Sequence, residues 1–246
     1  MKLPSNWNEI EVNQFIELRG LDSKPSDSIT EKYMDLILTA TDIDLEVVED
    51  MTLDELTDKV NQLSWLRKEP HKKYSKTIGV YKILPFKKIT WGMFIDLEHY
   101  YSKDYIKNMC TICGILYRKQ DVDKWDRDII EPYEYSPIER GKLFNELPIT
   151  SIYGVTSDYL DYRNSLINGA YSELFGSSIF EDEEELTPEE KAERLKDEQA
   201  EAKFTKWAFE SVTMGLAGDD ITKMNEILDM PLIYVLNILS MKNDLK

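Results

Sequence analysis

The densest apolar stretch of the chain, residues 83–117, constrains the fold most. Thr90 is placed to cap a helix that begins at Trp91, because a threonine side chain accepts a hydrogen bond from a backbone amide of the first turn. After a polar break at residues 102–104, apolar residues recur at three and four positions, the spacing of a buried helical stripe. They are Tyr105, Ile106, Met109, Ile112, Cys113, Leu116 and Tyr117. The stretch therefore predicts two consecutive helices on which other elements pack.

The rest of the chain also favours helices. Ten glycines and nine prolines are few for 246 residues, and 42% hydrophobic residues are enough for a buried core. A helix is expected over about residues 28–41, and Thr52 is expected to cap another over residues 53–62. The first of these turns Ile29, Tyr33, Leu36, Ile37 and Ala40 inward. Side chains alternate around Ile78 and Gly79, which predicts a β-hairpin near residues 74–84.

The sequence therefore predicts a mainly α fold in three parts. Residues 1–176 form a helical body with the hairpin, as one unit or as two lobes that meet near it. Residues 177–203 form an acidic linker helix, since residues 181–201 hold eleven acidic and three basic side chains. Such a charge run is typical of a solvated helix, and a docking site for a basic partner is the alternative. Residues 204–246 form a C-terminal helical segment that packs back or serves as a movable arm.

A short pattern occurs twice in the chain. Residues 10–18 align with residues 89–97 at an offset of 79. Both segments begin with Ile, have Val or Trp at the third position, and end with Phe, Ile, an acidic residue and Leu. Two similar helix starts explain the match, and an ancient duplication is the alternative.

Charge and targeting signals restrict the partners and the compartment. The net charge of −17 argues against a phosphate-binding surface and against an anionic membrane surface, because both need clustered Lys and Arg. A basic or strongly apolar partner stays open, as does mimicry of DNA. The chain shows no signal peptide and no run of about 20 apolar residues. We therefore expect a cytoplasmic protein that binds neither membranes nor nucleic acid directly.

No residue pattern indicates catalysis, a cofactor or a metal. Cys110 and Cys113 have the spacing of half a zinc site, but a structural zinc needs four ligands, and His71 and His99 lie in unrelated contexts. We interpret both cysteines as small buried hydrophobic residues. The acidic residues 121–128 lack the central glycine and the terminal glutamate of a calcium loop. The sequence therefore predicts that the protein is not an enzyme.

Several phrases of the sequence carry a family resemblance. They are WNEI-x-V-x-QF at residues 7–15, a segment with MTL-x-EL and L-x-WL at residues 51–70, and IT-x-x-x-FIDL at residues 89–97. In this order they resemble a group of tailed-bacteriophage proteins, common in phages of gut Bacteroidota, whose genes lie among virion assembly genes. The ending, with Trp207, residues 216–231 and residues 235–239, is similar to the C-terminal helices of phage tail assembly chaperones. These phrases are apolar patterns and not catalytic signatures.

The resemblance implies a non-enzymatic role in the infected bacterial host. A tail assembly chaperone would hold a helical tape-measure-type protein until tail-tube subunits surround it. Candidate partner-binding residues are Trp207, Leu232, Val235, Leu236 and Leu239. For the last four, internal packing against the central helices is the alternative. The alternative functions are a structural component retained in the virion, such as a connector, ring or internal protein, and an acidic DNA mimic used in host takeover. No cofactor or metal is implied.

Overall fold

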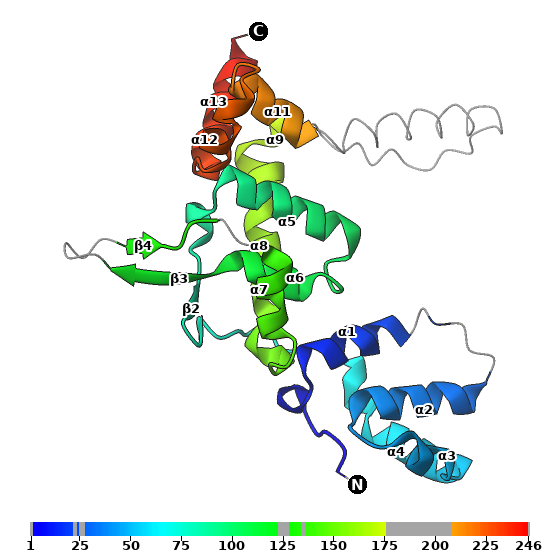
Figure 1. The fold of residues 1–246 in the computed structure, drawn as a ribbon. Coiled ribbons are helices and arrows are strands. Elements are labelled where there is room, and N and C mark those ends of the chain that lie inside the picture. The colour runs from blue at the N-terminus through cyan, green and yellow to red at the C-terminus, as the bar shows by residue number, and fades with distance from the viewer. Residues whose placement is uncertain are drawn as a thin grey trace, which may run out of the picture. The chain divides into compact units, whose positions relative to one another are not determined.

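The chain forms two compact units, each discontinuous in sequence. The computed structural model in Figure 1 describes residues 2–21, 24, 28–122, 128–133, 136–175 and 208–245. Unit 1 holds Met1–Leu84 and His99–Leu160, and unit 2 holds Pro85–Glu98 and Asp161–Lys246. Two of the three divisions fall inside helices α5 (Trp91–Asp104) and α8 (Tyr153–Ser165), and the third lies between Leu84 and Pro85. Helices predominate in both units, which confirms the mainly α fold class. The linker helix expected at residues 177–203 lies outside the described residues.

Unit 1 begins with helices whose starts follow the expected caps. Its elements are η1 (Trp7–Glu9), α1 (Val12–Leu21), α2 (Ile29–Ala40), α3 (Leu45–Glu49), α4 (Leu53–Gln62), η2 (Ser64–Arg67), α6 (Met109–Leu116), α7 (Pro137–Gly141), η4 (Lys142–Phe144), η5 (Ile149–Ser151) and most of α8. Ser28 Oγ accepts a hydrogen bond from Thr30 N at 3.2 Å. Thr52 and Glu55 form a capping box, in which each backbone amide donates to the other side chain.

Helix α6 lies in the core of unit 1. Every residue of α6 except Thr111 is buried. It crosses α7 closely at two glycines, because a Cβ atom on Gly114 would meet the α7 backbone and one on Gly141 would meet the α6 backbone. The sequence predicted this helix from Tyr105 to Tyr117. It begins instead at Met109, and Tyr117 is already the first residue of a strand.

A four-stranded antiparallel sheet has the order β1-β2-β3-β4. Its strands are β1 (Thr77–Ile78), β2 (Tyr81–Ile83), β3 (Tyr117–Val122) and β4 (Asp128–Ile130). The hairpin β1–β2 confirms the prediction, and Gly79 takes the positive φ of 57° in its turn. Strands β3 and β4 were not predicted. The polar residues after Tyr117 predict a surface excursion over residues 118–137, but Arg118 in β3 is fully buried. The strand was missed because its buried end is followed by polar residues, so no apolar alternation marks it.

The first copy of the repeated pattern pairs with a segment late in the sequence of unit 1. Residues 10–12 pair antiparallel with residues 147–149, through a bridge between Glu11 and Pro148. Backbone hydrogen bonds of 2.9 and 3.0 Å flank this bridge. Helix α1 therefore starts beside Pro148, and this proline directly precedes η5.

The second copy makes the same contacts in unit 2. Residues 89–91 pair with residues 230–232, through a bridge between Thr90 and Pro231 flanked by hydrogen bonds of 2.9 and 2.8 Å. Here α5 starts beside the proline that precedes α13 (Leu232–Asp244). Because the likeness extends to a second pair of segments, it favours duplication over two unrelated helix starts.

Unit 2 is built around the first turns of α5. Its other elements are η3 (Phe86–Lys88), the end of α8, a π-helical turn (Leu166–Ala170), α9 (Ser172–Phe175), α11 (Ala208–Leu216), η7 (Ile221–Lys223), α12 (Met224–Leu228) and α13. The buried Trp91 Nε1 donates to Thr213 Oγ1 at 2.8 Å. Phe209 packs edge-on against both Trp91 and Phe94. Residues 208–245 thus pack back within unit 2 through these contacts.

Candidate functional site

The sequence-predicted partner contacts are mostly covered. Leu232, Val235 and Leu236 are no more than 1% exposed inside unit 2, and Leu239 is half-buried. Trp207 lies outside the described residues. The structure therefore gives this stripe the internal packing that the sequence left open as an alternative.

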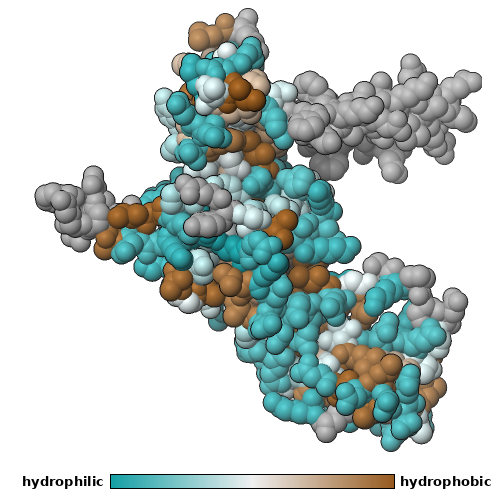
Figure 2. Space-filling model, in the orientation of Figure 1, coloured by the Kyte–Doolittle hydropathy of each residue, from teal (hydrophilic) through white to brown (hydrophobic). Residues whose placement is uncertain are grey.

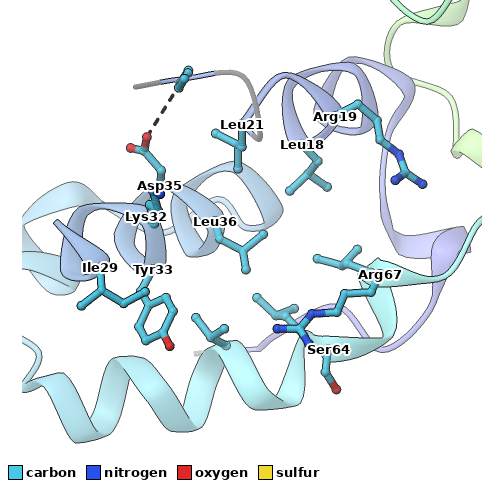
Figure 3. A pocket seen from close by; sticks show the side chains of 14 residues that line it. Leu18, Arg19, Leu21, Ile29, Lys32, Tyr33, Asp35, Leu36, Ser64 and Arg67 are labelled. Atoms are coloured by element: carbon cyan, nitrogen blue, oxygen red, sulfur yellow. Dashed lines mark ion pairs between the residues drawn. The ribbon is translucent and has the colours of Figure 1, made fainter. Parts of the chain in front are cut away.

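A pocket of about 390 Å³ in unit 1 is the strongest candidate site (Figure 3). It lies between α1, α2, α4 and η2. Its floor is buried and apolar, with Val60, Leu63 and Leu66 at most 9% exposed. Half-buried Leu18, Leu21, Tyr33 and Leu36 form its walls. Figure 2 shows hydrophobic residues at the surface of these N-terminal helices, with hydrophilic residues around them.

The pocket exists because the apolar stripe of α2 is longer than the surface that covers it. At the C-terminal end of this stripe, Ile37 and Ala40 are at most 3% exposed. At the N-terminal end, Ile29 is 54% exposed and lines the pocket together with Tyr33 and Leu36. The prediction that this stripe turns inward is confirmed for Ile37 and Ala40 and is wrong for Ile29. The stripe is covered at its C-terminal end, and its N-terminal end borders the pocket.

Cationic side chains border the pocket. They are Arg19, Lys24, Lys32 and Arg67, and among the described lining residues the carboxylate is Asp35. Two of these cations have partners. Arg19 Nη2 lies 2.9 Å from Glu69 Oε1, and its guanidinium also lies over the Phe15 ring. Lys24 Nζ lies 4.0 Å from a carboxylate oxygen of Asp35.

Lys32 and Arg67 make no ion pair with any residue that the structure describes. Both are exposed. Figure 3 shows the Arg67 guanidinium beside Ser64, extended toward α2, whereas that of Arg19 points away from the pocket. Two positive charges that no described carboxylate pairs with therefore flank an apolar floor, in a chain whose net charge is −17.

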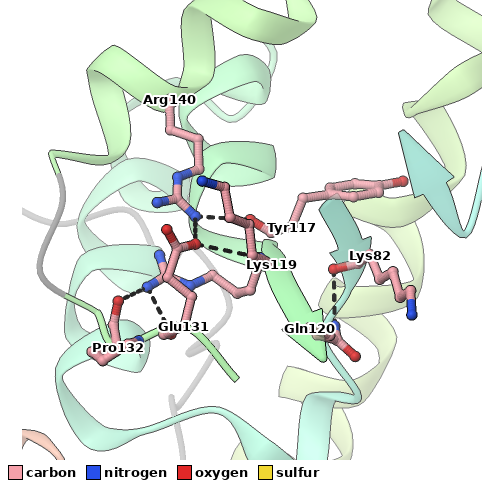
Figure 4. A network of polar contacts seen from close by, with 8 residues as sticks. Lys82, Tyr117, Lys119, Gln120, Glu131, Pro132 and Arg140 are labelled. Carbon is pink, nitrogen blue, oxygen red and sulfur yellow. Dashed lines mark hydrogen bonds and ion pairs between the residues drawn. The ribbon is translucent and has the colours of Figure 1, made fainter. Parts of the chain in front are cut away.

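A second polar cluster is buried and structural (Figure 4). Arg140 Nη1 donates to Glu131 Oε2 at 2.6 Å, and Arg118 Nη2 donates to the carbonyl oxygens of Glu131 and Pro132. Burial alone would raise the pKa of Glu131, but the hydrogen bonds from Arg140 and the Lys119 amide, with the charges of both arginines, hold it below its usual value. The cluster fixes the segment after β4 against β3 and α7. Its groups face one another and not an opening.

The two cysteines are buried in the folded protein. Cys110 and Cys113 are free and buried in α6. Burial raises the pKa of the Cys110 thiol from 9.0 to about 12, and burial together with the neighbouring Cys110 raises that of Cys113. The thiolate is the reactive form, so both stay inert near neutral pH. This confirms their interpretation as small hydrophobic residues.

Among the residues that the structure describes, no group of three or more His, Cys, Asp and Glu is placed to hold a metal ion. None of the helices described is both long and apolar enough to cross a membrane. No protein-family model, no curated protein and no solved structure matches this chain. The pocket between α1, α2 and α4 is therefore the feature from which a function can be argued.

Proposed function

We propose that this protein is a non-enzymatic phage assembly protein of the tail assembly chaperone type. It binds an amphipathic helix of a tape-measure-type partner in the cytoplasm of the infected bacterium. The observation that carries this proposal is the open end of the α2 stripe, where Ile29, Tyr33 and Leu36 border the apolar pocket of unit 1. The phage resemblance of the sequence supports the class of partner.

The pocket suits the way in which grooves bind helices. An amphipathic helix presents apolar side chains at positions i, i+3, i+4 and i+7, and these side chains enter an apolar groove. Here the groove has a buried floor from α4 and η2 and walls from α1 and α2. Its residues come from elements that pack into a folded unit without a partner, so the site exists before binding. A preformed site avoids part of the ordering cost of association.

The charge of the chain suits a holding role. A net charge of −17 makes loaded complexes repel one another, which opposes aggregation while the partner waits for tail-tube subunits. The same charge disfavours nucleic acid as a ligand. The proposed contact is the pocket of unit 1, in place of the α13 stripe that the sequence suggested and that is covered in unit 2.

Ile29→Asp tests the proposal, because it puts a carboxylate at the open edge of the pocket. Asp is well tolerated in the first turn of a helix, so the change should leave α2 folded. Ile138→Asp is the matched control, since Ile138 is 53% exposed, against 54% for Ile29, and also lies in the first turn of a helix. Each variant is co-expressed with the tape-measure protein of the same phage, and the co-purified partner is quantified.

We expect Ile29→Asp to weaken partner binding by at least about tenfold, because it places a carboxylate against the apolar face of the partner, and Ile138→Asp to leave it unchanged. Equal partner recovery with both variants would refute the pocket as the binding site. Mass spectrometry of purified virions and of infected-cell lysate then separates the two assembly roles. A chaperone is abundant in the lysate and absent from virions, whereas a fixed copy number in virions would make this chain a structural component.

A further inference from the structure

We propose that the pocket of unit 1 selects a helix whose apolar face is flanked by Asp and Glu side chains, and that Lys32 and Arg67 make this selection. The inference rests on the proposed function and adds the chemistry of the partner. It is carried by Lys32 and Arg67, which lie at the border of an apolar floor and make no ion pair among the described residues, in a chain with an excess of acids.

The ion pairs within the protein show which cations at the pocket already have a partner. Arg19 forms an ion pair with Glu69, and Lys24 lies near Asp35. Lys32 and Arg67 have no ion pair among the described residues; Lys32 lies on α2, a wall of the pocket, and Arg67 lies at the end of η2, which supplies part of the floor. A helix that lies on this floor would bring its flanking positions close to both cations. Acidic flanks would gain two ion pairs there, and basic flanks would meet two like charges.

The rest of the surface strengthens this selectivity. A protein with a net charge of −17 repels acidic peptides at most places, so an acidic helix is held only where the local field is positive. Complementary charges at the rim of an interface chiefly set the rate of association, its salt dependence and the exclusion of wrong partners. Apolar contact with the floor supplies most of the affinity. The two contributions can therefore be removed separately.

The test uses three synthetic amphipathic peptides of about 18 residues with one apolar face and with Glu, Gln or Lys at four flanking positions. Binding to the full-length protein is measured by fluorescence anisotropy at low and high salt. We expect the Glu peptide to bind on the order of 3- to 10-fold more tightly than the Lys peptide at low salt, as two exposed ion pairs allow. The difference should shrink as salt screens the charges.

Lys32→Glu combined with Arg67→Glu should reverse the order of the Glu and Lys peptides. The control combines Lys87→Glu with Lys103→Glu, two exposed lysines outside the pocket, and changes the net charge by the same amount. This control should preserve the original order of affinities. A reversal in both double variants, or equal affinities for all three peptides in the wild type, would overturn the inference.

The outcomes also separate this inference from the proposed function. If partner binding depends on Ile29 but shows no preference for acidic flanks, the charge selection fails and the helix-binding role stands. If partner binding ignores Ile29, the proposed site itself fails. Dodecanoate is included as a small carboxylate with an apolar chain. Its binding to the wild type but not to Ile29→Asp, without binding of any peptide, would assign the pocket to small amphiphiles and overturn the inference.

Discussion

The close crossing of α6 and α7 predicts that Gly114→Ala is strongly destabilising. A Cβ atom at position 114 would lie 2.9 Å from Gly141 N, and closer still to the carbonyl oxygen of Pro137. Real Cβ atoms essentially never come within 3.0 Å of such atoms. Both are backbone atoms, so no side-chain rotation relieves the contact. The two helices must therefore move apart.

Several contacts depend on this crossing. Overpacking a core costs about 1–3 kcal/mol, and here the displaced helix also carries Arg140, the ion partner of Glu131. We expect the free energy of unfolding to fall by about 3 kcal/mol, a large part of the roughly 5–15 kcal/mol of a typical domain. For a chain of this length, the melting temperature should fall by about 6–12 °C.

Urea and thermal unfolding followed by far-ultraviolet circular dichroism measure this loss. Gly20→Ala is the control, because Gly20 lies in α1 of the same unit and an added Cβ there meets nothing within 4 Å. It should not destabilise, and it should gain up to about 1 kcal/mol from the higher helix propensity of alanine. A Gly114→Ala protein within about 0.5 kcal/mol of the wild type, the usual range of surface substitutions, would refute the close approach of α6 and α7.

Two further predictions concern buried polar groups. Thr213→Val keeps the shape of the side chain but removes the acceptor of the Trp91 indole, so unfolding by urea should become easier by about 1–3 kcal/mol; an unchanged midpoint would contradict this hydrogen bond. The pKa of Cys110 is raised from 9.0 to about 12 by burial, so the unfolded thiol ionises first, and stability should hold up to about pH 9 and fall as the pH rises toward 12. Urea midpoints from pH 8 to 11 test this, and Cys110→Ala should flatten the fall.

The elements that the sequence predicted are those with local signals. Thr52 and Thr90 marked helix starts through short-range capping, and the turn at Gly79 marked the hairpin. Strand β3 was missed because its stability comes from distant groups. The buried guanidinium of Arg118 donates hydrogen bonds to the carbonyl oxygens of Glu131 and Pro132, and no pattern around residue 118 shows this.

The pocket shows a similar limit. Periodicity placed Ile29, Tyr33 and Leu36 on one face of a helix, but it does not show how far the neighbouring helices extend over that face. The cationic border combines Lys32 with Arg67, which lie on different elements, so their proximity to one floor follows from tertiary packing. The α13 stripe failed as an accessible site for the same reason, since an apolar stripe looks identical in sequence whether a partner or the same chain covers it.

The two copies of the repeated pattern are interleaved along the chain, and this has a consequence for folding. Residues 10–12 can pair only after residues 147–149 have been made. Residues 89–91 lie between these two segments in the sequence and pair with the later residues 230–232. During synthesis both segments are therefore unpaired at the same time, and the formation of such long-range contacts is slow.

Because the backbone pairing is the same in both copies, it does not determine which of the two segments a given proline segment pairs with. The discrimination must come from side chains beside each bridge. Phe15 packs edge-on against Tyr153 in unit 1, and the Trp91 indole finds Thr213 in unit 2. These side-chain contacts differ between the two units, so a swapped pairing would lose them.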